Sequence, residues 1–103
     1  MPQLNLNADY LSQIKTILKQ HAPELEVWAY GSRINGNCHE ASDLDLVIRN
    51  PENLQKPINN LAQLKQAFID SNLPILVDLM DWACLPDSYR EEIEKLHLVI
   101  RGG

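Results

Sequence analysis

Two aspartates alternate with leucines in "DLDLVI", residues 43–48. Successive side chains of a strand point to opposite faces, so Asp43 and Asp45 would share one face of a strand. The apolar residues between and after them would enter a core. Two neighbouring carboxylates repel each other, and the pKa of one should rise unless a cation lies between them. Mg²⁺ prefers such oxygen ligands and fills its remaining positions with water and substrate phosphate oxygens.

A third carboxylate lies in the apolar run "ILVDLM", residues 75–80. Asp78 should be costly there unless it faces the same acidic cluster. Three carboxylates could hold two ions about 3.5–4 Å apart, on the attacking and leaving oxygens of a displacement. Strand parity places the nearby Asp81 on the opposite face, so we favour Asp78 as the third acid. The alternative for the whole set is an ordinary strand with a solvated face.

A Gly-Ser pair, Gly31 and Ser32, follows the apolar run "LEVWAY" and opens "SRING". Glycine lets a phosphate approach the backbone closely, and the N–H groups at a helix start donate to anions. The Ser32 hydroxyl adds a donor, and the Arg33 guanidinium can bind a phosphate oxygen in its plane. Alone, the pair is also compatible with a plain turn, and Arg33 with a surface residue that caps it.

The elements that would position these residues follow from periodicity. Helical spacing covers residues 8–21, with Asn7 as N-cap, and residues 59–71. Strands are expected at residues 25–30, 43–48 and 75–80. A last helix is opened by Pro86, Asp87 and Ser88, with Ser88 and Glu91 spaced for a capping box. The tail "LHLVI" fits either the end of that helix or an edge strand.

We therefore expect an α/β (α+β) fold, with residues 1–103 as one small domain. Its mixed sheet would have three or four strands, with helices mainly on one face. The other face would stay open for a site.

Composition narrows the functional classes. The chain has a formal net charge of -5, 45% hydrophobic residues and no basic stripe. Binding to a nucleic-acid template normally needs clustered Lys and Arg, so we expect no template. No apolar run approaches the ~18 residues of a membrane span, and the start lacks a signal-peptide pattern. Two isolated cysteines fit a reducing cytoplasm.

The combined pattern resembles the polymerase-β-like nucleotidyltransferase superfamily. The pattern is an apolar strand, Gly-Ser, a spacer and then Asp-x-Asp on the next strand, with a third acid on a later strand. The stretch "GSRINGNCHEASDLDLVI" is most similar to the minimal nucleotidyltransferase (MNT) branch, at Gly31 to Arg33, Gly36 and Ser42 to Leu46. "VDLMDW" resembles the third-acid segment of that branch and places the acid at Asp78. The likeness covers about residues 10 to 100.

The resemblance implies ATP as nucleotide, Mg²⁺ as cofactor and transfer of a nucleoside monophosphate to a hydroxyl. Asp43 and Asp45 would hold the metal ions, and Asp78 would complete the second metal site and help deprotonate the acceptor. Gly31 and Ser32 would hold the β- and γ-phosphates, with Arg33 as a further contact.

The MNT branch also implies a partner, a helical HEPN toxin whose tyrosine receives AMP, with the MNT protein as antitoxin. Only one helix and a tail follow Asp78, so a partner would have to bring the acceptor. Two alternatives stay open. One is a nucleotide-binding antitoxin or regulatory subunit that neutralises its partner by contact alone. The other is a nucleotidyltransferase acting on a small molecule.

Overall fold

The structure, a computed structural model, describes residue 4 and residues 6–35 and 43–102. Its elements follow the expected order with three short additions, α2, the 3-10 turn η1 and the final β4. They are α1 (Ala8–His21), β1 (Glu26–Tyr30), α2 (Ser32–Asn35), β2 (Leu44–Arg49), α3 (Leu61–Ile69), β3 (Val77–Asp81), the 3-10 turn η1 (Trp82–Cys84), α4 (Asp87–Lys95) and β4 (Leu98–Arg101).

The strands form one mixed sheet in the order β3-β2-β1-β4. β1 is antiparallel to both β2 and β4, and β2 is parallel to β3. The tail is therefore an edge strand and not the end of the last helix. The alternation of its side chains is that of a strand: Leu98 and Ile100 pack toward the main core, while Val99 between them is exposed.

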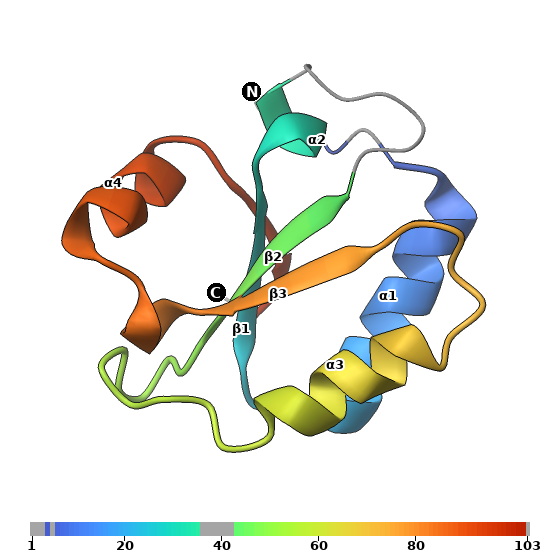
Figure 1. The fold of residues 1–103 in the computed structure, drawn as a ribbon, viewed down its shortest axis with the longest axis horizontal. Helices are drawn as coiled ribbons and strands as arrows, with labels where there is room; N and C mark the ends of the chain where they lie inside the picture. The colour runs from blue at the N-terminus through green and yellow to red at the C-terminus, as the bar shows by residue number, and fades with distance from the viewer. Residues whose placement is uncertain (1–3, 5, 36–42, 103) are drawn as a thin grey trace.

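One face of the sheet is covered by α1 and α3, which lie side by side (Figure 1). The Asn7 side chain accepts a hydrogen bond from the Asp9 N–H and begins α1 as expected. Ile14 and Leu18, one turn apart on α1, are fully buried. They join a core of strand residues that all point to this face: Val27, Ala29, Leu44, Leu46, Ile48 and Leu79.

The other face is partly covered by η1 and α4, which lie across the sheet from α1 and α3 (Figure 1). Ile93 of α4 and Trp82 of η1 are buried here against Tyr30 and Val47. The mixed four-stranded sheet of the predicted fold class is confirmed. α1 and α3 share one face as expected, and α4 leaves only part of the second face open.

A stack of aromatic and cationic side chains fills one end of this second face. The Arg49 guanidinium lies 3.7 Å from the centroid of the Trp28 ring and 4.5 Å from that of Trp82. Arg49 also forms a buried ion pair with Glu26, and His97 stacks on Trp28 at 3.8 Å. Because this stack occupies the Glu26 end of β1, the open part of the face lies at the opposite end, near Tyr30.

The prediction of a capping box at the start of α4 is wrong. Pro86 is the N-cap residue, with φ -63° and ψ 154°, and the cap has no side-chain hydrogen bond. Ser88 therefore lies within the first helical turn, where its hydroxyl cannot cap the N3 N–H. Asp87 in that turn interacts favourably with the helix dipole.

Among the described residues, no helix combines the length and the apolar character that crossing a membrane requires.

Candidate active site

The parallel pairing of β2 with β3 brings two of the predicted acids together. Asp45 is the register partner of Asp78, so the two side chains leave the same face of neighbouring strands. Asp43 directly precedes β2 and is exposed, as is Asp78, whereas Asp45 is half-buried. Three carboxylates thus gather at one end of the second face.

Their mutual repulsion is visible in the ionisation of Asp45. Partial burial raises the pKa of Asp45, and the charges of Asp78 and then Asp43 raise it further. All three carboxylates therefore lie within electrostatic reach of one another. A cation placed among them would relieve both effects.

Gly31 directly follows β1 and lies against this cluster. Its φ is +82°, in the left-handed region that favours glycine. A Cβ atom added to it would lie 2.4 Å from Oδ2 of Asp45, closer than real Cβ contacts. A side chain at this position would displace the Asp45 carboxylate, and the turn into α2 starts beside a candidate metal ligand. The motif positions Gly36 and Ser42 lie outside the described residues, and so does the Ser32 side chain.

Two predicted alternatives are resolved by burial. Arg33 is only 6% exposed and is engaged in an interaction, so a surface arginine is the wrong description. Its contact with phosphate stays a prediction. Asp81 is also buried, and it accepts hydrogen bonds from the N–H groups of Ile58 (2.9 Å) and Ala83 (3.1 Å). Asp81 therefore fixes backbone, while Asp78 faces solvent in the acidic cluster.

Tyr30 and Tyr89 are site residues that the sequence reading did not assign. Tyr30 is the cross-strand partner of Asp45, and its ring meets that of Tyr89 edge-on, with centroids 6.4 Å apart. Burial raises the pKa of Tyr30 strongly, with further contributions from Asp45, Tyr89 and Asp78. The Tyr30 hydroxyl is therefore held in its protonated form. Only the register of β1 with β2 places Tyr30 there, so no local sequence signal could have found it.

A cavity of about 320 Å³ adjoins the acidic cluster. Tyr30, Gly31 and Asp45 form its sheet side, and Tyr89 and Glu92 belong to its α4 side. It lies on the open part of the second face.

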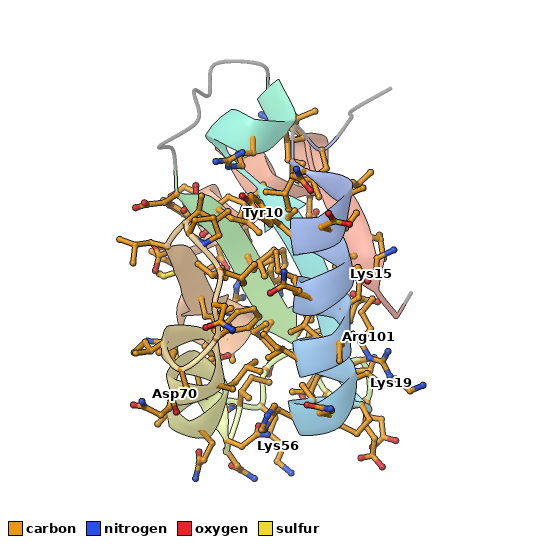
Figure 2. All side chains as sticks on the ribbon, turned by 90° about the vertical axis from the view of Figure 1, so that its right-hand side faces the viewer. Tyr10, Lys15, Lys19, Lys56, Asp70 and Arg101 are labelled. Atoms are coloured by element: carbon orange, nitrogen blue, oxygen red, sulfur yellow. The ribbon has the colours of Figure 1, made fainter. Side chains whose placement is uncertain are left out.

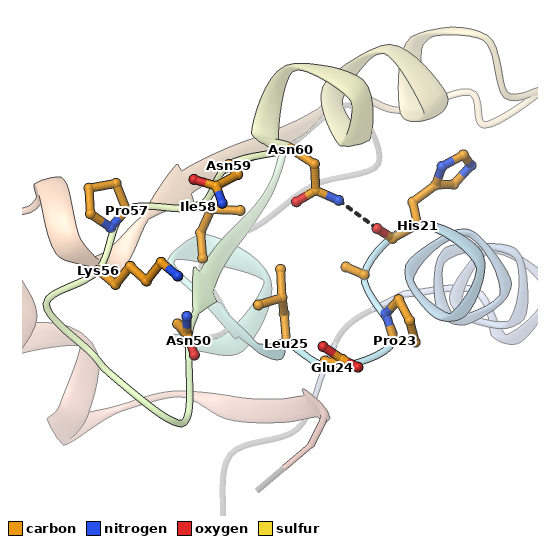
Figure 3. Close-up of a pocket in the computed structure, with 11 residues that line it drawn as sticks. His21, Pro23, Glu24, Leu25, Asn50, Lys56, Pro57, Ile58, Asn59 and Asn60 are labelled. Atoms are coloured by element: carbon orange, nitrogen blue, oxygen red, sulfur yellow. Dashed lines mark hydrogen bonds between the residues drawn. The ribbon is translucent and has the colours of Figure 1, made fainter.

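Two other cavities lie away from the acids. One, of about 190 Å³, lies between the end of α1 and the loop before α3, where the Asn60 amide donates to the His21 carbonyl (Figure 3). The other, of about 450 Å³, is lined by Lys15, Lys19 and Arg101 (Figure 2). This basic groove between α1 and β4 was not predicted, because Arg101 comes from β4, far along the chain from Lys15 and Lys19 of α1.

The carboxylates suit Mg²⁺ held jointly with a nucleotide. Within residues 4, 6–35 and 43–102, no three His, Cys, Asp or Glu side chains form a ready-made metal site. Mg²⁺ needs no such cage, because it is usually bound by one or two carboxylates together with substrate phosphates. Asp45 and Asp78, side by side on one face of β2 and β3, are a pair of that kind.

A small mixed sheet with a Gly-led turn, strand acids and a facing third acid is the arrangement of a nucleotidyltransferase. The family described as "Nucleotidyltransferase domain" matches residues 11–101, and the chain belongs to this family. The predicted superfamily is thereby confirmed.

Two relatives sharpen the comparison. The chain is 45% identical over 101 residues to "Probable protein adenylyltransferase MntA" of Haemophilus influenzae, covering 96% of this chain and 85% of that protein. A solved structure described as "Crystal structure of the toxin-antitoxin with AMP-PNP" has a chain with a similar fold. Its TM-score is 0.71 at 23% identity, over 90% of this chain and 73% of that one.

Proposed function

We propose that this chain is a protein adenylyltransferase that transfers AMP from ATP to a tyrosine hydroxyl of a HEPN-type partner toxin and thereby acts as its antitoxin. The observation that carries the proposal is the register pairing of Asp45 with Asp78, with Gly31 packed against Asp45. The likeness to MntA supports a protein acceptor, and the likeness to a toxin-antitoxin chain supports the partner. The HEPN class and the tyrosine come from the resemblance of the sequence to the MNT branch.

Each site residue has a role in this reaction. Asp43 and Asp45 would hold Mg²⁺, with Asp78 completing the set. The ion, when bound, neutralises the charge that develops on the phosphate oxygens. The backbone at Gly31 and Ser32 would receive the β- and γ-phosphates, with Arg33 as a further donor. The chain's own task is to position the reactants and to accept a proton.

The bond changes balance without a further reactant. The acceptor oxygen attacks the α-phosphorus of ATP, an oxygen–phosphorus bond forms, and the bond to the β-phosphate oxygen breaks. Pyrophosphate leaves, and the acceptor proton moves to the Asp78 carboxylate. The raised pKa of Asp45 explains the need for a cation, because three ionised carboxylates alone would repel the triphosphate.

The test is label transfer from α-phosphate-labelled ATP with Mg²⁺ to the proposed HEPN-type toxin. We expect a labelled partner band with the wild type and none with Asp43→Asn. Asp70→Asn is a matched control, because Asp70 is an exposed carboxylate at the end of α3. Neutralisation of the partner by Asp43→Asn as strong as by the wild type would instead establish inhibition by contact alone.

A further inference from the structure

Tyr89 and Glu92, on the α4 side of the 320 Å³ cavity, have no role in the reaction described above. Its volume is at the lower end of the ~300–1,000 Å³ of small-molecule pockets. It touches the reaction centre at Gly31 and Asp45, and α4 supplies its outer wall. A group that enters the cavity therefore lies next to a reactant held at Asp45.

Its position in the sheet separates it from the acceptor. Asp78 lies on β3 at one edge of the sheet, whereas the cavity opens on the β1 side, beyond β2. An acceptor activated by Asp78 approaches over β3. The nucleoside of the ATP donor then needs space on another side of the α-phosphate. Among the described residues, this cavity provides such space.

The lining suits an uncharged aromatic group with amino donors. Tyr89 is 50% exposed, and its contact with Tyr30 is edge-on, so ring surface is accessible for stacking. Ile93 and Leu96 add apolar surface. Asp45 and Glu92 are its charged lining residues, and both are acidic, so the lining supplies no cationic side chain for an anionic group.

We propose that this cavity is the nucleoside subsite: Tyr89 stacks on the base, and the Glu92 carboxylate accepts a hydrogen bond from its exocyclic amino group. The subsite thereby selects adenine over bases that carry an oxygen at the corresponding position. This inference rests on the proposed function for the identity of the donor. It adds two residues that determine specificity and that lie outside the Gly-Ser and Asp-x-Asp motifs.

The stacking is tested by calorimetric binding of AMP-PNP with Mg²⁺ to the full chain. Removal of an aromatic stacking partner is expected to weaken binding about 5- to 100-fold, so Tyr89→Ala should show such a loss. Tyr89→Phe keeps the ring and should bind within about 2-fold of the wild type. Tyr10→Ala is the control, because Tyr10 belongs to α1 on the other face of the sheet. Circular dichroism checks that each variant is folded.

The amino contact is tested with ATP against inosine triphosphate, which carries an oxygen in place of the amino group. We expect the wild type to bind ATP about 3- to 10-fold more tightly, from the worth of one hydrogen bond. Glu92→Ala should abolish this preference. Glu91→Ala should keep it, because Glu91 is an exposed neighbour on α4 outside the cavity lining.

The outcomes separate this inference from the proposed function. Tyr89-dependent nucleotide binding without AMP transfer would reject the transferase and keep the subsite. AMP transfer with unchanged binding by Tyr89→Ala would reject the subsite and keep the transferase. A loss with Tyr89→Phe as large as with Tyr89→Ala would overturn the stacking, because the hydroxyl and not the ring would then matter. Absence of AMP-PNP binding by the wild type would overturn both.

Discussion

The replacement Gly31→Ala tests the closest contact of the site. A Cβ atom at this position would lie 2.4 Å from Oδ2 of Asp45, and ordinary van der Waals contact begins at 3.4 Å. The carboxylate must therefore move by about 1 Å, and a misplacement of that size can cost about 10²-fold in rate. The φ of +82° adds about 1–2 kcal/mol to the cost of folding with alanine.

We expect Gly31→Ala to lose more than the about 1–2 kcal/mol of the backbone cost in the free energy of unfolding, because the contact with Asp45 adds to it, and nucleotidyl transfer to fall about 100-fold. Urea unfolding measures the first quantity and label transfer the second. Gly102→Ala is the matched control, because Gly102 has the same φ of +82° but packs against Glu26. It should lose a similar or smaller amount of stability and keep its transfer rate.

A double-mutant cycle isolates the clash from the backbone cost. In an Asp45→Ala background the carboxylate is gone, so Gly31→Ala should cost only the conformational part. A cost in that background equal to the cost in the wild type would show that the two residues do not meet. Transfer by Gly31→Ala within about 3-fold of the wild type would refute the close-approach reasoning altogether.

Further perturbations distinguish the acids and the aromatic stack. Because the pKa of Asp45 is raised in the folded state, its ionisation destabilises the protein, so Asp45→Asn should unfold at higher urea than the wild type at pH 7. This advantage should shrink as the pH falls through the raised pKa and vanish below about 4; a pH-independent difference would contradict it. Asp78→Asn should abolish transfer at unchanged stability, whereas Asp81→Ala should lose about 1–3 kcal/mol of stability and keep transfer, and the reverse pattern would exchange their roles. Arg49→Met leaves the Glu26 carboxylate buried without its partner and should cost about 3–5 kcal/mol in urea unfolding, much of it restored by adding Glu26→Gln; no recovery would assign the loss to the ring contacts.

Local pattern was sufficient for most of the fold. Helical periodicity predicted α1 and α3, and the Asn7 cap is where it was expected. Alternation in "DLDLVI" placed Leu44 and Leu46 in the core and turned Asp45 the other way. These predictions succeeded because the period of a helix or strand is a property of neighbouring residues.

The same local reasoning failed where contacts with other residues decided the structure. Ser88 has the spacing of a capping box, yet Pro86 takes the cap position and places Ser88 inside the helix. The tail was undecided, because "LHLVI" is apolar enough for either element. Its pairing with β1 made it a strand.

The sequence by itself determined which residues could do the chemistry: the acids Asp43, Asp45 and Asp78, and the Gly-Ser turn that precedes them. Only the tertiary structure decided which of these meet. The register of Asp45 with Asp78, the contact of Gly31 with Asp45 and the cavity at Tyr89 each join segments far apart in the chain. Register and helix docking depend on how whole faces pack together, and that packing energy has no counterpart in a local spacing.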